Sequence, residues 1–501
     1  MIRQCLFACA LAAALHAQTP LHDAASRDDL AAVRQLLKAG ANPNGATRVD
    51  GVTPLSLASV TGDAELIETL LKAGGDANVP LTDGTTPLMT AAASGSVAAV
   101  RALLDHGAAI DAKESHGETA LMFAAGRNRA AVIRFLIQKG ADTRITTEVT
   151  KLGRALFDED GNPIPAAGGG RGGRGGGGGA FAGGRGGAGG QARGTPATVK
   201  GGMTALLLAA RNGYPEAVKA LVESGADVNL VSAGDQSSAL VIAICNGHYD
   251  VAAYLLDHNA DPNLATIDGL AALYATEDTE YAQVGWAPNP ITAQEKTGYL
   301  DLLKILLAYH ANPNAQLTKA LWFRPTSHQE EWVDKKGATP FWRAAMATDV
   351  DAMRILIKGG ADPKLASGEG VTPLMVAAGL GWAANASRTV PDGWLPVVKY
   401  LVGELDADVN AHDIYNYTAL HGAAYRGDNE VVNYLVSKGA KLDIRSKKGQ
   451  TVTDMANGPM VNAHLPIEHP DTIALLEKLG APRPEVPEAA APKAPRKIET
   501  K

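Results

Sequence analysis

Apolar and polar positions along the chain follow one short pattern that returns about every 33 residues. Each copy has an Ala-rich apolar stretch that ends at a Gly. A second stretch follows with apolar residues at helical spacing, as at Val97, Val100, Leu103 and Leu104. A period of this length with two helical segments indicates a repeat array. One copy cannot bury its apolar faces alone, so neighbouring copies must stack.

Each copy opens with Thr-Pro-Leu or a close variant of it. Pro suits the first turn of a helix because it has no N–H to leave unpaired, and the preceding Thr can cap the exposed amides. The phrase occurs at Thr53–Leu55, Thr86–Leu88, Thr119–Leu121, Thr204–Leu206, Ser238–Leu240, Ala271–Leu273, Thr339–Phe341, Thr372–Leu374 and Thr418–Leu420, with a worn copy at Thr451–Thr453.

Two glycines and a closing phrase keep phase with this opening. A Gly two residues before the Thr, such as Gly84, follows an Asp and predicts a hairpin-like turn. A Gly nine residues after the Thr, such as Gly62, predicts the end of the first helix at a positive φ. A phrase of the form Leu-Leu-x-x-Gly-Ala-Asn-x-Asn, as at Leu36–Asn44, ends the second helix.

These marks resemble the ankyrin repeat of bacterial, secreted proteins over nearly all of residues 18–481. The resemblance implies an all-α solenoid of about ten helix-turn-helix repeats with hairpin-like turns. It implies that partner proteins bind a concave surface made of these turns and the first helices. It also implies that His22 and His421, at the fourth position of the phrase, form structural hydrogen bonds within and between repeats.

The order of segments predicts an exported protein. Residues 1–17 read as a signal peptide, with Arg3 before an apolar run from Cys5 to Leu15. A lipoprotein cleavage box at Leu6–Cys9 is the less favoured alternative. Repeats are expected at 18–143 and 201–481, around an insertion at 144–200, and a disordered tail at 482–501. No later stretch is apolar for 18 residues, so no membrane span is expected.

The insertion at 144–200 is rich in Gly and Arg and is predicted to be disordered. We expect it to split the array into about four repeats before it and six or seven after it. An RNA-binding Arg-Gly-Gly role is disfavoured because the Arg residues are few and the chain carries a net charge of -7. No nucleic-acid partner is therefore expected.

Three further insertions, near 279–298, 315–335 and 382–393, are rich in aromatic residues. All six Trp residues of the chain lie between Trp286 and Trp394. They either form a shared binding patch or pack the insertions onto the solenoid, and the two roles are compatible. The candidate contact residues are Tyr281, Trp286, Trp322, Phe323, Trp332, Trp342, Trp382 and Trp394.

Composition adds few candidates for chemistry. Hydrophobic residues make up 46% of the chain but aromatic ones only 5%, which suits thin helical layers. Of three Cys residues only Cys245 follows the signal, and we expect it to be a buried small hydrophobe. The sequence contains no nucleotide-binding loop, nucleophile elbow or Cys-x-x-Cys motif.

Scattered acidic and His residues do not define a catalytic or metal site. The acidic residues near the aromatic insertions have no defined pair spacing. In the group His464, Glu468 and His469, two prolines forbid the rigid helix face that a metal pair needs. The acidic residues in question are Asp278, Glu280, Glu295, Glu330, Glu331 and Asp334.

These observations predict an exported, monomeric scaffold that binds protein partners of unknown identity. No catalytic residue, cofactor or metal is expected. The alternatives are binding of a small ligand or carbohydrate by the Trp-rich loops, with hydrolysis as an extension of it, and a structural spacer in the cell envelope. A signal peptide specifies only export, so periplasmic and extracellular locations both remain open.

Overall fold

A computed structural model describes residues 19–47, 49–151, 156–157, 163–164, 199–282, 290, 292–319, 321, 333–382, 387–458 and 467–483. The chain divides into two compact units. Unit 1 comprises Met1–Ile267 with Ile291–Thr297, and unit 2 comprises Asp268–Pro290 with Gly298–Lys501. The predicted signal peptide, most of the Gly/Arg-rich insertion and nearly all of the predicted tail lie outside the described residues.

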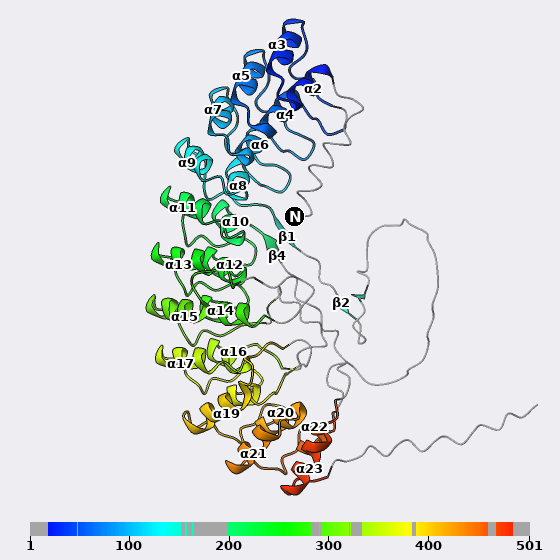
Figure 1. The fold of residues 1–501 in the computed structure, drawn as a ribbon, viewed down its shortest axis with the longest axis vertical. Coiled ribbons are helices and arrows are strands. Elements are labelled where there is room, and N and C mark those ends of the chain that lie inside the picture. Colours follow the sequence, from blue (N-terminus) through cyan, green and yellow to red (C-terminus); the bar gives the residue numbers. More distant parts are fainter. Residues whose placement is uncertain are drawn as a thin grey trace, which may run out of the picture. The chain divides into compact units, whose positions relative to one another are not determined.

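Unit 1 consists of stacked pairs of short helices in two layers (Figure 1). The first helix of each pair packs on the first helices of the neighbouring pairs, and successive second helices pack together from α3 to α11. The first helices are α2 (Pro20–Ser26), α4 (Pro54–Thr61), α6 (Pro87–Ser94), α8 (Ala120–Ala125), α10 (Ala205–Arg211) and α12 (Ala239–Cys245). The second helices are α3 (Leu30–Lys38), α5 (Ala64–Lys72), α7 (Val97–Asp105), α9 (Ala130–Gln138), α11 (Pro215–Glu223) and α13 (Tyr249–Asp257).

Unit 2 has the same two-layered stack (Figure 1). Its first helices are α14 (Ala272–Glu280), α16 (Pro340–Met346), α18 (Pro373–Ala377), α20 (Ala419–Arg426) and α22 (Val452–Ala456). Its second helices are α15 (Tyr299–Ala308), α17 (Val350–Lys358), α19 (Trp394–Gly403), α21 (Asn429–Ser437) and α23 (Pro470–Lys478). Each unit therefore confirms the predicted helix-turn-helix solenoid.

The opening phrase of each repeat begins its first helix as predicted. Thr53 and Thr86 have extended backbones and their hydroxyls accept from the backbone N–H groups of Ser56 and Met89. Pro follows each Thr inside the first turn, where its missing N–H removes no hydrogen bond. Helix α4 ends at Gly62, whose φ of 74° lies in the left-handed region that favours glycine.

Small side chains let the two helical layers approach closely. In α4 every residue from Pro54 to Ser59 is buried, whereas α5 buries only one face, which includes Leu66 and Leu70. Cys245, at the end of α12, is half-buried, so the prediction of a buried side chain was too strong. The core of each unit is thus a thin layer of Ala, Leu, Val and Ile that continues from repeat to repeat.

Neighbouring hairpins are joined tip to tip by backbone hydrogen bonds, which we call the tip ladder. In unit 1, Ser115 N–H donates to Asp83 O at 2.8 Å. In unit 2, Ile414 N–H donates to Glu369 O at 2.9 Å, and Lys447 N–H donates to Tyr415 O at 2.8 Å. Strand-like backbones in such close contact leave little room for side chains between them.

Gly84 shows why the hairpins require glycine. Its φ is 87°, and a Cβ added there would lie 3.0 Å from Glu114 Cα in the next hairpin. Any larger residue would force the two hairpins apart as well as strain its own backbone. At Gly84, and likewise at Gly202, Gly269 and Gly337, the glycine therefore serves the contact between repeats as well as the turn itself.

A second inter-repeat contact is made in several repeats by an Asn side chain, and we call it the Asn staple. The Asn410 amide donates to Gly439 O at 3.0 Å and its oxygen accepts from Lys441 N–H at 2.8 Å. Each staple thus satisfies two backbone groups just after the second helix of the following repeat. The same pair of bonds is made by Asn44, Asn78, Asn229 and Asn314.

The Gly/Arg-rich insertion extends one hairpin of unit 1. Strand β1 (Val149–Lys151) pairs antiparallel with β4 (Val199–Gly201), and β2 (Leu156–Phe157) pairs with β3 (Pro163–Ile164). Below this base, α8 packs on α10 and α9 packs on α11. Among the described residues four helix pairs precede the insertion and seven follow it, within the expected numbers, and the repeats on either side of it stack directly on each other.

The three aromatic insertions of the sequence lie at two kinds of position. The segment near 279–298 separates α14 from α15, and that near 382–393 lies between α18 and α19. The segment near 315–335 lies within a hairpin, because Leu317 N–H donates to Ala338 O at 3.1 Å across its base. Insertions at these positions leave the helix layers intact.

Removing an Asn staple should weaken the array. Asn410→Ala leaves Gly439 O and Lys441 N–H without their side-chain partner, so we expect the free energy of unfolding to fall by about 1–3 kcal/mol. Urea unfolding followed by circular dichroism measures it. The control is Asn433→Ala, which removes only an exposed bond within α21 and should change stability by about 0.5 kcal/mol or less. Equal effects of the two changes would contradict the staple.

Candidate interaction surface

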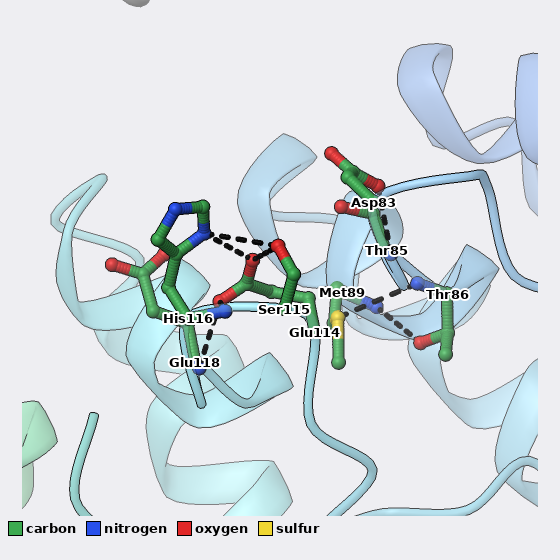
Figure 2. A network of polar contacts seen from close by, with 8 residues as sticks. All are labelled: Asp83, Thr85, Thr86, Met89, Glu114, Ser115, His116 and Glu118. Atoms are coloured by element: carbon green, nitrogen blue, oxygen red, sulfur yellow. Dashed lines mark hydrogen bonds and ion pairs between the residues drawn. The ribbon is translucent and has the colours of Figure 1, made fainter. Parts of the chain in front are cut away.

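An acidic side chain fixes the backbone of several hairpin tips. In unit 1, Asp83 accepts from Thr85 N–H at 2.9 Å, and Glu114 accepts from the N–H groups of His116 and Glu118 at 2.8 and 3.0 Å (Figure 2). In unit 2, Asp413 accepts in the same way from Tyr415 N–H at 2.9 Å. The tips are therefore rigid platforms for the side chains that they expose.

The Glu114–Ser115–His116 group has the residue types of a nucleophilic triad but not its geometry (Figure 2). The Ser115 hydroxyl and a Glu114 oxygen both contact Nδ1 of His116, at 3.1 and 2.9 Å. A proton relay needs the nucleophile and the carboxylate on opposite ring nitrogens. Desolvation opposes ionisation of Glu114, but its hydrogen bonds outweigh that effect and hold its pKa below the ordinary value. The Glu114–Ser115–His116 group therefore fixes the backbone of the hairpin turn.

In unit 2, the tip at 413–417 carries large apolar side chains with different roles. Ile414 and Tyr415 are exposed. Tyr417 is buried, and its hydroxyl donates to Gln450 Oε1 at 2.7 Å. The side chains of one tip therefore divide between exposed positions at Ile414 and Tyr415 and a structural position at Tyr417.

The structure describes half of the candidate contact residues. Trp286, Trp322, Phe323 and Trp332 lie outside the described residues, whereas Tyr281, Trp342, Trp382 and Trp394 lie within them. Tyr281, Trp382 and Trp394 are half-buried.

Trp342 is a correction to the predicted contact set. Its side chain is fully buried in α16 and its indole N–H donates to Val371 O at 2.9 Å. A side chain enclosed in this way packs the array and offers no surface to a partner. Trp394 differs, because it is only half-buried, and the Arg426 guanidinium lies over its ring, 3.8 Å from the centroid.

Two of the aromatic insertions meet at the turn between α16 and α17. Before the insertion near 279–298, Tyr281 donates its hydroxyl to Asp349 Oδ2 at 2.7 Å. After that insertion, Tyr299 donates to the same oxygen at 2.7 Å. From the insertion near 382–393, Val390 N–H donates to Ala347 O at 2.9 Å. One turn of three residues therefore holds the flanks of both insertions.

The insertion near 315–335 reaches the same part of unit 2. Val333, at its end, is buried against Gly381, where an added Cβ would lie 2.9 Å from Val333 Cγ2. Gly381 is also the start of the insertion near 382–393. The flanks of all three aromatic insertions thus converge within unit 2, which the linear sequence alone did not show.

A buried charged cluster lies beneath this convergence. Arg343 of α16 contacts Asp278 of α14 at 3.0 Å and donates to Tyr281 O at 2.7 Å. Glu277, next to Asp278, is completely buried, and neither of its carboxyl oxygens has a hydrogen-bond partner. Burial, reinforced by the charge of Asp349, raises the pKa of Glu277 well above its ordinary value.

Sequence reasoning missed Glu277, although the repeat alignment contains the signal. Glu277 lies six residues after Ala271, the start of its opening phrase. Most other repeats have Ala at this position, where the first helix packs against its neighbours. The equivalent residues include Ala92, Ala125, Ala210, Ala345, Ala378 and Ala424. A carboxyl group at a small-residue packing position is a departure that phase analysis can detect.

Two of the other acidic candidates have structural partners. Asp278 pairs with Arg343, as above, and Glu295 accepts from Asp250 N–H at 2.8 Å within unit 1. His469 contacts Tyr425 O through Nε2 at 3.1 Å. Across the part of the chain that the structure describes, no group of three or more His, Cys, Asp or Glu residues is placed to hold a metal ion. The described helices also include none long and apolar enough to cross a membrane.

The two His residues of the opening phrase are buried. His22 contacts the Thr19 hydroxyl within its repeat at 2.8 Å and Val52 O in the next repeat at 3.0 Å. His421 contacts the Thr418 hydroxyl at 2.9 Å, and burial lowers its pKa to about 4. The structural role that the resemblance implied is confirmed for both residues, with the bond between repeats seen at His22.

Stacked helix pairs, capped opening phrases and hydrogen-bonded hairpins define an ankyrin-type array. The family described as ankyrin repeats (3 copies) matches residues 4–80, 55–147, 190–266 and 385–448, more than half of the chain. The chain therefore belongs to the ankyrin-repeat family, whose members are typically interaction scaffolds without enzymatic activity.

Individual relatives match shorter stretches. The chain is 40% identical over 92 residues to ankyrin repeat and SAM domain-containing protein 6 of Rattus norvegicus, which is 18% of this chain and 9% of that protein. It is 30% identical over 161 residues to alpha-latrocrustotoxin-Lt1a of Latrodectus tredecimguttatus, 30% of this chain and 10% of that one. It thus spans a tenth or less of these relatives. The solved human ASB11 ankyrin repeat domain is 22% identical with a TM-score of 0.39, covering 59% of this chain and 100% of that one.

The buried carboxyl group of Glu277 should make stability depend on pH. Because folding raises the pKa of Glu277, its protonation contributes stability that is fully present below the unfolded pKa near 4.5. This stability is lost as the pH rises through the folded pKa. Glu277→Gln removes this titration without changing size. We expect it to raise the free energy of unfolding at pH 8 by about 1–3 kcal/mol relative to wild type, and by less at pH 5.

Urea unfolding of both proteins at pH 5, 6.5 and 8 measures this effect. Glu430→Gln, at an exposed position in the first turn of α21, is the control and should leave the pH dependence unchanged. A difference between wild type and Glu277→Gln that stays constant from pH 5 to pH 8 would rule out the linkage.

Proposed function

We propose that this chain is an exported scaffold that binds protein partners and catalyses no reaction. Its contact surface comprises the hairpin tips and the aromatic insertions of unit 2. The observation that carries the proposal is the tip ladder, whose backbone bonds join neighbouring hairpins, together with side chains such as Asp413 that fix individual tips. Rigid tips lose little conformational entropy on binding, so the side chains that they expose are suited to recognition.

The aromatic insertions support the same proposal for unit 2. Their flanks converge on the turn at Ala347–Asp349 and on the contact of Val333 with Gly381. Trp394 is half-buried at the end of one insertion and presents a partly covered ring. Large aromatic side chains on an ordered support bury much area at small entropic cost, which is typical of binding hot spots.

A partner-capture experiment tests the contact region. Wild-type protein and a Trp286→Ala, Trp332→Ala, Trp394→Ala triple variant are used to capture proteins from envelope extract, followed by mass spectrometry. We expect the variant to lose at least one partner. The control is Tyr309→Ala, which removes an exposed aromatic outside the insertions. If the triple variant captures the same partners as wild type, the aromatic insertions are not part of the contact surface. If neither protein captures a partner, the result favours the alternative of a structural spacer in the cell envelope.

The exported location is tested by expressing the full chain in a bacterial host. We expect it in the periplasmic or extracellular fraction, with a mature N-terminus at Gln18 by Edman sequencing. Leu11→Arg interrupts the apolar run and should leave the uncleaved chain in the cytoplasm. A wild-type chain that keeps Met1 and stays in the cytoplasm would refute export while leaving the scaffold proposal intact.

A further inference from the structure

The tip at 413–417 exposes two adjacent large apolar side chains. Ile414 is 47% exposed and Tyr415 is 41% exposed. At the equivalent positions of other described tips, Val49 and Ile267 are single large apolar residues, each followed by an Asp, and the remaining tips carry small, polar or charged residues, such as Thr82–Asp83 and Gly368–Glu369. A pair of large apolar side chains held in water at the end of a hairpin has no role in the core of unit 2 and is more informative than single exposed residues.

The backbone of this tip is fixed from three directions. The Asp413 carboxylate accepts from the N–H groups of Tyr415 and Tyr417 at 2.9 and 2.8 Å. Ile414 N–H donates to Glu369 O in the preceding hairpin, and Tyr415 O accepts from Lys447 N–H in the following one. The two apolar side chains are therefore presented in a defined arrangement.

The charged side chains on the two sides of the tip differ in whether they have partners within unit 2. Glu369, on one side, accepts the Tyr415 hydroxyl at 3.2 Å and Asp334 N–H at 3.4 Å. Lys447 and Lys448, on the other side, are exposed, and their ammonium groups form no ion pair or hydrogen bond with any residue that the structure describes. The negative neighbour is thus occupied within unit 2, while the positive neighbours are available to a ligand.

We propose that this tip binds a protein segment that carries acidic side chains next to a bulky apolar one. The apolar side chain covers Ile414 and Tyr415, and the acidic side chains pair with Lys447 and Lys448. This inference rests on the proposed scaffold function and specifies the chemistry of one partner. Charge complementarity favours such a partner over neutral or basic ones and speeds its association.

An anionic membrane is the less suitable occupant. Membrane-binding clusters use several basic residues next to a membrane-inserted or amphipathic helix. Here the tip offers two lysines and two apolar side chains, with the acidic Glu369 beside them. A narrow hairpin end with mixed charge matches a peptide better than an extended surface.

The probe is a random 12-residue peptide library displayed on phage and selected against the full chain. Enriched peptides are resynthesised and their affinities measured by isothermal titration calorimetry. Two variants test the tip: Lys447→Glu with Lys448→Glu, and Ile414→Ala with Tyr415→Ala. The matched control is Lys335→Glu with Lys336→Glu, a lysine pair at another hairpin of unit 2. Circular dichroism verifies that each variant folds.

We expect enriched peptides to be acidic with a bulky apolar residue. Each tip variant should weaken their binding about tenfold or more, whereas the control pair should not. Raising the salt concentration should weaken binding to wild type. Peptides that bind wild type and both tip variants equally would overturn the assignment of this tip but not the scaffold function. A library that enriches nothing would count against both.

A vesicle-binding experiment tests the alternative that the tip binds an anionic membrane. Vesicles of phosphatidylserine and phosphatidylcholine are sedimented with wild type and with the Lys447→Glu, Lys448→Glu variant. We expect no sedimentation of either protein. Sedimentation of wild type that the variant loses, without enrichment of acidic peptides, would overturn the proposal in favour of a membrane surface.

Discussion

The contact between successive repeats is the interaction on which both units depend. A single helix pair is too small to bury its apolar faces, so its stability comes from its neighbours. The tip ladder recurs at successive interfaces within each unit, as at Lys447 with Tyr415, and the Asn staple recurs at some of them, as at Asn410 with Gly439. These bonds use backbone groups that would otherwise end unpaired at the hairpins and helix ends. Residue identity elsewhere can then vary widely, because the register of the stack does not depend on it.

Much of this arrangement was predictable from the sequence, because the interface bonds need particular residue types at fixed phase. The Thr that caps each first helix, the Gly that allows hairpins to approach and the Asn of the staple all occur in the repeat pattern. The sequence identified Thr53 as a helix cap, Gly84 as a turn residue and Asn44 as part of the phrase that ends a second helix, whereas the contacts of Gly84 and Asn44 with the next repeat are seen in the structure. Local chemistry and periodic spacing agree at these residues, which is the condition under which sequence reasoning succeeds.

The parts that sequence reasoning missed depend on contacts between residues far apart in the chain. Composition marked the segment at 144–200 as a break, but only the pairing of β1 with β4 shows that it extends a hairpin. Trp342 looked like its neighbours in an aromatic region, but its buried indole donates to Val371 O, 29 residues later in the next repeat. Glu277 was visible as an exception to the Ala pattern, yet its consequence follows from Arg343 and Asp349 around it.

Departures from the repeat pattern are of two kinds, insertions and a substitution, and they occur at different positions in the repeats. Insertions occur at hairpin tips and at helix–helix turns, so they add surface without removing an interface bond. Glu277 instead occupies an interface position, and it lies beside a buried pair whose charges offset each other. A buried carboxyl group without a hydrogen bond destabilises the fold, so its retention calls for a cause outside local packing. The flanks of the insertion near 279–298 both bind Asp349, whose charge acts on Glu277. The repeat that contains Glu277 is therefore also the one that carries this insertion, between α14 and α15.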